Sequence, residues 1–330
     1  MWHTYLFFEI SVLFRGKSYL TASVKGIALL CGAKYMVIKR CLLSLLFLLY
    51  GICICASAGQ EPVRIRAPQS ELDASHDYFR SLIELALSKS VVDGKKLPLT
   101  QLTMAPYMVQ WRALEELRAG RLIDIYWAGT SIERERALRA IPIPLVKGLL
   151  GFRVFAIHNS RRPLLENTNN LNDLKKLVFC QGAHWPDTDI MLSAGLSVQP
   201  SSVYENMFRQ VVGRRCDAFP RGVHEGFSEV EARQELYSGL ELYTDTILYY
   251  PFPMFFFVNK SNEVLAQRLQ TGLERAISDG SFDNHLKTHP VTRHLFPLES
   301  WINSNYIKIE NPFLPSTLDT ADERYWITPP

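Results

Sequence analysis

Strand-like and helix-like segments alternate along the chain from Gly59 onward, and this order constrains the fold more than any other feature. Residues 63–67 read as a short strand, and the next apolar side chains share one helix face: Phe79, Leu82, Ile83 and Ala86. Further strands are predicted at residues 122–127, 152–157, 177–180, 216–219 and 254–258, and helices at 108–117, 204–212 and 265–276. Gly120 and Gly195 are expected to end two helices. Strands that alternate with helices are typical of parallel α/β units, so we expect an α/β protein.

The first 58 residues look like a targeting segment rather than part of the fold. From Met36 the sequence runs Met-Val-Ile-Lys-Arg, an almost wholly apolar stretch at 41–55, and Ala56-Ser57-Ala58. A basic start, a short apolar core and a small-x-small site predict a secretory signal peptide at 36–58, cleaved before Gly59. A membrane anchor is the alternative, but spanning needs about 20 apolar residues. Residues 1–35 are interpreted as an upstream extension from a misassigned start, or as an extra hydrophobic patch.

The charge is unevenly distributed. Residues 1–58 hold six of the 36 basic side chains and one of the 33 acidic ones, which leaves 30 basic and 32 acidic residues in the rest. The body of the chain therefore has a net charge of −2. It lacks the basic surface that nucleic-acid binding requires, so DNA and RNA are not expected as partners.

Export would change the interpretation of the cysteines. Four of the six precede Gly59, and the mature chain keeps Cys180 and Cys216. An oxidising compartment permits a disulfide between them. Both also stand in short apolar runs, where buried free thiols fit equally well. The sequence leaves both states open.

Motifs for catalysis, cofactors and metals are missing from the sequence. There is no GxGxxG, phosphate loop, GxSxG or HExxH pattern. His285 and His289 have the i, i+4 spacing of a metal pair, but without a nearby cysteine or carboxylate cluster we interpret them as a solvated helix face. His224-Glu225, near Asp217, is interpreted as a hydrogen-bonded loop. We therefore predict that the protein is not an enzyme, and that it has no catalytic residue, no metal and no cofactor.

The most informative segment is residues 117–136, Leu-Arg-Ala-Gly-Arg-Leu-Ile-Asp-Ile-Tyr-Trp-Ala-Gly-Thr-Ser-Ile-Glu-Arg-Glu-Arg. It resembles the periplasmic solute-binding proteins of ABC-type amino-acid uptake, extracellular solute-binding protein family 3. The family pattern is matched at five positions: Gly120, Asp124, Ser131, Ile132 and Arg136. Five further stretches resemble family motifs in the right order: residues 149–155, 178–182, 215–218, 256–260 and 277–282.

The resemblance implies a two-lobed type II periplasmic-binding fold with two interdomain crossovers. Residues 59–150 with 251–330 would form lobe 1, and residues 151–250 would form lobe 2. Such proteins close on a small solute in the interdomain cleft. The implied protein is a periplasmic monomer that delivers a small anionic or zwitterionic solute to an ABC permease or a membrane sensor.

The resemblance also implies binding residues. Arg136 would hold a ligand carboxylate through two parallel hydrogen bonds. Gly129, Thr130 and Ser131 would offer backbone N–H groups and a hydroxyl to the same carboxylate. A surface ion pair of Arg136 with Glu133 or Glu135 is the alternative.

The sequence departs from the family in the part of the site that recognises the amino group. His184 replaces a threonine, Gly222 replaces the aspartate for the ligand's amino group, and an N-terminal aromatic segment is missing. With Arg136, Arg221 and His184 in the cleft, an anionic solute such as a dicarboxylate is favoured. Trp127 and Trp185 could form apolar walls, although Trp127 fits core packing equally well.

Two other functions stay open. A few relatives of this fold resemble periplasmic dehydratases that act on cyclic carboxylic acids. Here His184 or Glu225 would have to serve as the acid or base. The second of these alternatives is a scaffold that binds no ligand and serves in protein contacts.

Overall fold

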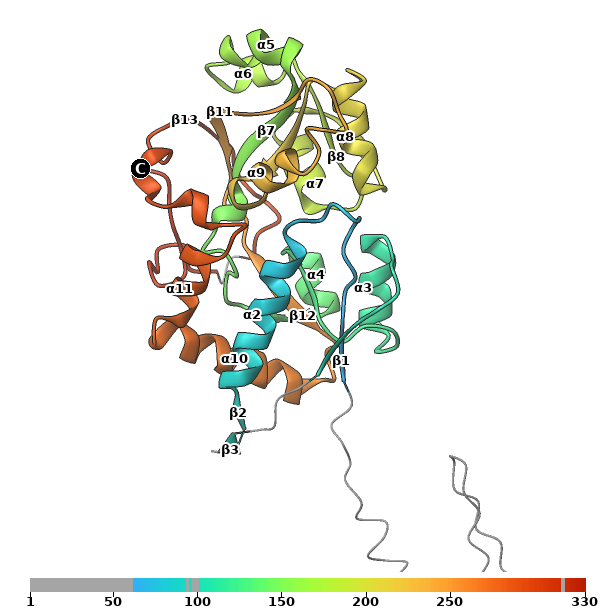
Figure 1. Ribbon diagram of the computed structural model, residues 1–330, viewed down its shortest axis with the longest axis vertical. Helices are drawn as coiled ribbons and strands as arrows, with labels where there is room; N and C mark the ends of the chain where they lie inside the picture. Colours follow the sequence, from blue (N-terminus) through green and yellow to red (C-terminus); the bar gives the residue numbers. More distant parts are fainter. Residues whose placement is uncertain (1–61, 93–94, 97–100, 316–317) are drawn as a thin grey trace, which may run out of the picture. The chain divides into compact units, whose positions relative to one another are not determined.

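The computed structural model describes residues 62–330 except 93–94, 97–100 and 316–317 (Figure 1). The predicted signal peptide, its cleavage before Gly59 and the upstream extension lie outside the described residues. Gln60–Pro330 form one compact unit. Within the described part, none of the helices combines the length and apolar character that crossing a bilayer would take.

A three-stranded antiparallel sheet has the order β5 (Tyr126–Gly129), β12 (Met254–Val258) and β6 (Arg139–Ile141). All five residues of β12 are buried, as expected for a central strand with a continuous apolar sequence. Beside it β1 (Val63–Ile65) pairs in parallel with β4 (Leu102–Met104), and Ile65 forms a bridge with Ile125. Strand β2 (Val91–Val92) pairs in antiparallel orientation with β3 (Lys95–Lys96).

A six-stranded sheet holds the remaining strands in the order β13-β11-β7-β10-β8-β9. Their bounds are Asn305–Lys308, Leu240–Tyr249, Phe152–His158, Ala218–Gly222, Val178–Gly182 and Ser197–Ser201. Strand β7 runs antiparallel to both β10 and β11, whereas β8 runs parallel to β9 and β10. Because β13 also runs parallel to β11, the sheet is mixed, with parallel and antiparallel pairs.

The longer helices include those predicted at residues 108–117, 204–212 and 265–276, with small shifts of their ends. They are α2 (His76–Lys89), α3 (Gln110–Arg118), α7 (Pro186–Ser193), α8 (Tyr204–Val212), α9 (Val223–Glu231), α10 (Glu263–Ser278) and α11 (Ser281–Thr288). Shorter ones are α4 (Ile132–Ala137), α5 (Arg162–Glu166) and α6 (Leu171–Leu174). Gly120 and Gly195 have φ of 66° and 79°, which confirms the predicted left-handed helix ends.

Helices α2 and α10 lie side by side, although about 180 residues separate them in the sequence (Figure 1). Gly272 makes this approach possible, because a Cβ at that position would stand 1.9 Å from the carbonyl oxygen of Ala86. The predicted apolar face of α2 is buried against this neighbour. The C-terminal strand β13 belongs to the six-stranded sheet, where it pairs with β11.

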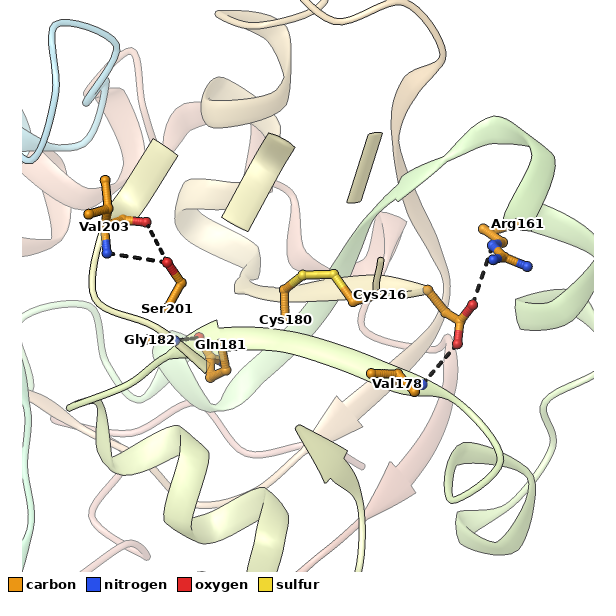
Figure 2. The surroundings of a disulfide bond; sticks show 9 residues. Arg161, Val178, Cys180, Gln181, Gly182, Ser201, Val203 and Cys216 are labelled. Carbon is orange, nitrogen blue, oxygen red and sulfur yellow. Dashed lines mark hydrogen bonds and ion pairs between the residues drawn. A yellow bond between two sulfur atoms is a disulfide. The ribbon is translucent and has the colours of Figure 1, made fainter. Parts of the chain in front are cut away.

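A disulfide joins Cys180 of β8 to Cys216, two residues before β10, with Cα atoms 5.6 Å apart (Figure 2). It resolves the choice between paired and free thiols that the sequence left open. At the start of β8, Asp217 accepts a hydrogen bond from the Val178 backbone N–H at 2.9 Å and pairs with Arg161 at 3.3 Å. Adjacent strands are thus tied together by covalent and polar contacts.

Candidate functional site

A narrow cavity lies between the two sheets, and Leu150, Arg153, Phe252 and Met254 form part of its lining. Its wall combines residues from the end of β1, helix α2, strand β5, helix α4, helix α7, strand β10 and helix α9. The space open to the centre of a water molecule is about 50 Å³. At about 10–15 Å³ for each water, this is room for roughly three to five non-hydrogen atoms.

Four arginines and two carboxylates line this cavity: Arg66, Arg134, Arg153, Arg221, Asp187 and Glu225. All six side chains are largely buried. A charged group in such a place requires a partner, because burial removes the hydration that stabilises it in water. The contacts of each arginine therefore indicate which of them could receive an anion.

Arg134 is a buried cation whose contacts in the described structure are all with neutral groups. Its Nη1 donates to the Gly129 carbonyl at 2.6 Å, and its Nη2 donates to the His184 carbonyl at 2.9 Å and to Gln110 Oε1. Only 8% of the residue is exposed. Burial lowers the pKa of Arg134 to about 10, and Tyr126, Glu133 and Asp189 offset this effect only in part.

Arg66 stacks its guanidinium 4.6 Å above the Trp127 ring and pairs with Asp73 at 2.8 Å. Its Nε is buried without a hydrogen-bond partner among the described residues. The Arg66 carbonyl oxygen also contacts His76 Nε2 at 2.9 Å, which fixes the backbone at the end of β1. One donor of this arginine therefore remains available.

Arg153 contacts both carboxylates of the cavity. It forms an ion pair with Asp187, lies 3.7 Å from Glu225 Oε1, and donates from Nε to Tyr250 Oη at 2.9 Å. The Tyr250 hydroxyl in turn donates to Asp187 at 2.7 Å. Nη1 of Arg153 has no hydrogen-bond partner in the described part of the chain.

Arg221 has its charge compensated within the protein. Nε and Nη2 donate to the two oxygens of Glu229 at 2.6 and 2.8 Å, and Nη2 lies 2.9 Å from Glu225. Burial opposes its charge, yet Glu225 and Glu229 keep the pKa of Arg221 well above its usual value. The predicted role in binding a second ligand carboxyl group would require this pairing to open.

Arg136, the predicted carboxylate ligand, lies exposed on α4 and faces a wider groove that also contains Trp111 and Phe313. No hydrogen bond or ion pair of Arg136 occurs among the described residues, including the alternative pair with Glu133 or Glu135. Ser131 caps the helix by accepting from the Arg134 N–H at 3.2 Å. Because each helical residue turns by about 100°, positions 134 and 136 face opposite sides. Arg134 is thus the residue of α4 that lies at the cavity.

The loop before α4 uses its polar groups within the protein. The Thr130 N–H donates to the Pro253 carbonyl at 3.0 Å, and its hydroxyl donates to Glu135 at 2.6 Å. Gly129 lies under the Phe252 ring, so closely that a Cβ would stand 2.0 Å from it. Ser131 serves as the helix cap. Their predicted contacts with a carboxylate would need these bonds to change.

The two predicted tryptophans both line the cavity. Trp127 is also a core residue, 5.5 Å from Phe79 in a stacked arrangement, as the core-packing alternative expects. Trp185 lies beneath Arg221 at 5.1 Å and rests on Gly182, where a Cβ would collide with the indole. His184 contributes its carbonyl oxygen through Arg134, while its side chain is exposed.

Sequence reasoning missed Arg66, Arg134, Arg153 and Asp187. A charged residue inside an apolar strand was the available signal for Arg153, which interrupts the buried stretch Phe152–His158. For Arg134 the local signal was the Ser131 cap, which sets the phase of the helix.

Comparisons with known proteins identify the fold. No family model matches the chain, and no curated protein matches it. Among solved structures, an ancestral arginine-binding protein bound to arginine is 14% identical, with a TM-score of 0.52 over 69% of this chain and 97% of that one. An arginine-specific periplasmic binding protein of Salmonella typhimurium is 13% identical, with a TM-score of 0.50 over 68% and 97%. An ancestral amino-acid-binding protein, a precursor of cyclohexadienyl dehydratase, is 12% identical, with a TM-score of 0.50 over 68% and 94%.

Proposed function

Starting from the fold of the periplasmic amino-acid-binding proteins, which confirms the predicted α/β architecture and the resemblance, we propose that this protein is a solute-binding protein. Its solute is a small carboxylate, held in the cavity between the two sheets. The protein acts in the periplasm and delivers the solute to an ABC permease or a membrane sensor. The division into lobes at residues 59–150 with 251–330 and 151–250 is part of this proposal.

One observation carries the proposal, namely the buried Arg134 without a carboxylate in contact. A guanidinium binds a carboxylate through two parallel, charge-assisted hydrogen bonds. A bound anion would compensate the desolvation that lowers the pKa of Arg134. Within the described structure, the other cavity arginines have carboxylates of the protein in contact: Arg66 with Asp73, Arg153 with Asp187, and Arg221 with Glu229.

Two further donors support an anionic solute. Arg66 Nε and Arg153 Nη1 are both buried, both belong to side chains that line the cavity, and neither has a hydrogen-bond acceptor among the described residues. Buried donors without acceptors are rare in folded proteins, so they favour a missing partner rich in oxygen. The small volume favours a solute of few atoms, unless the lobes separate.

The test compares two arginines of the same helix. Arg134→Gln keeps an amide that can donate to the neighbouring carbonyls, but it removes the charged guanidinium and its two parallel N–H groups. Hydrogen bonds to charged groups contribute roughly 1.5–3 kcal/mol, so carboxylate affinity should fall by about tenfold to a hundredfold. Arg136→Gln is the matched control and should bind like the wild type.

The solute is found first by thermal shift with a panel of small mono- and dicarboxylates, because a ligand of the native state raises its apparent stability. Calorimetric titration of both variants then gives the affinities. Loss of binding in Arg136→Gln alone would restore the assignment made from the sequence. Equal binding by both variants would exclude this cavity as the site. A panel without any shift favours the ligand-free scaffold, and consumption of an acid favours an enzyme.

A further inference from the structure

At one end of the cavity, oxygen atoms and aromatic rings surround the guanidinium group of Arg153. Asp187 and Glu225 supply carboxylate oxygens, and the Tyr250 hydroxyl supplies another oxygen. The rings of Tyr250 and Phe252 each lie 5.5 Å from the centre of the guanidinium. Carboxylates around the edge with aromatic rings at the faces suit a planar cation, because its N–H groups point outward in the plane.

The cation in this place is a side chain of the protein itself, Arg153. Arg153 extends from β7 and is a charged residue within an otherwise apolar stretch of the strand. Only 1% of it is exposed. Its guanidinium binds Asp187 of α7 and approaches Glu225 of α9. These contacts therefore bring groups from two separate helices to one planar cation on a strand.

The negative charge of the buried Asp187 carboxylate is compensated by this cation. The groups that contact its carboxylate in the described residues include Arg153 and the Tyr250 hydroxyl, and Asp187 is 3% exposed. Without Arg153, one carboxylate would stay buried with a neutral hydroxyl, which is costly. A free guanidinium of the same shape would relieve that cost.

We propose that Asp187, Glu225, Tyr250 and Phe252 form a guanidinium subsite of the cavity, which Arg153 fills permanently and thereby closes to cationic solutes. Arg153 is then a specificity-determining residue: it compensates the negative charge at this end of the cavity, and its Nη1, which has no hydrogen bond among the described residues, adds a donor for an anion. This inference rests on the proposed function, since it explains why the cavity takes an anionic rather than a cationic solute.

The experiment replaces Arg153 by alanine and adds the missing group as a separate molecule. Methylguanidinium is titrated into the full-length mature protein, wild type and Arg153→Ala, at concentrations far below those that denature proteins. Ammonium chloride at equal ionic strength controls for salt. We expect Arg153→Ala to bind methylguanidinium at least about tenfold more tightly than the wild type, seen as a rise in melting temperature and by calorimetry.

A double variant tests whether the subsite holds the cation. Arg153→Ala with Asp187→Asn removes the buried carboxylate together with its partner, so it should recover stability relative to Arg153→Ala. It should also lose the response to methylguanidinium. If Arg153→Ala refolds poorly by itself, its refolding yield with and without methylguanidinium gives the same comparison.

The outcomes separate this inference from the proposed function. Binding of methylguanidinium by Arg153→Ala alone supports it. Equal binding by the wild type, no binding by a folded Arg153→Ala, or no recovery of a misfolded one overturns it. Carboxylate binding by the wild type is measured independently, so the proposed function can stand when the subsite fails, and the reverse.

Discussion

Replacing His224 should make the protein less sensitive to mild acid. The His224 side chain is 0% exposed, and neither ring nitrogen has a hydrogen-bond partner among the described residues. The charged and titratable groups around it come from four elements: Arg153 of β7, Arg221 of β10, Glu225 and Glu229 of α9, and His294 of the turn Arg293–Leu295. Burial, reinforced by Arg153 and Arg221, lowers the pKa of His224 to about 3.

The sign of the effect follows from proton uptake. Between pH 3 and 6.5 the unfolded chain binds a proton at this histidine and the native protein does not. The free energy of unfolding therefore falls as the pH drops below 6.5. At pH 5.0 the loss is about 1.4 kcal/mol multiplied by about 1.5 pH units, or about 2 kcal/mol.

His224→Phe removes the titration and keeps a ring beside Phe79, whose ring centre lies 6.3 Å away. Urea unfolding at pH 7.5 and at pH 5.0 gives the free energies of both proteins. The difference between variant and wild type should shift in favour of the variant by about 2 kcal/mol at the lower pH. Any cost of repacking is common to both pH values and cancels. The same difference at both would refute the reasoning.

Two further predictions concern stability. Replacing Cys180 and Cys216 by serine opens a loop with a sequence separation of 36, which should cost about 4 kcal/mol by chain entropy and lower the melting temperature by about 8–15 °C; an unchanged melting curve would contradict this. Gly272→Ala should destabilise by about 1–3 kcal/mol in urea, because its methyl group meets the backbone of Ala86. Exposed Gln267→Ala on the same helix should be nearly neutral, and equal stability of the two variants would show that α2 and α10 separate freely.

The sequence predicted the fold better than the site, for physical reasons. Local patterns such as the glycine helix ends and the apolar strand Met254–Val258 depend on neighbours in the chain, so they could be recognised directly. The ten-residue β11 was missed because its central residues, Thr244 to Thr246, are polar and interrupt the apolar pattern. Its place in the sheet comes from pairing with distant strands.

The site depends on helix phase and on ion pairs between distant segments. The motif aligned Arg136 with the family arginine, but the Ser131 cap starts α4 at a phase that directs Arg134 to the cavity. Arg221 lines the cavity, yet Glu229 on the next helix accepts the hydrogen bonds of its guanidinium. Spacing along the chain cannot show which charges are already paired.

The disulfide has a consequence for proteolysis. The ring closed by Cys180 and Cys216 contains α7, β9 and α8, and with them the cavity residues Trp185 and Asp187. A protease that cuts the chain inside this ring leaves two fragments that remain covalently joined. Strands β8 and β10 would stay paired on either side of the cut. The cavity wall can therefore be nicked while the protein migrates as one species until a reductant is added.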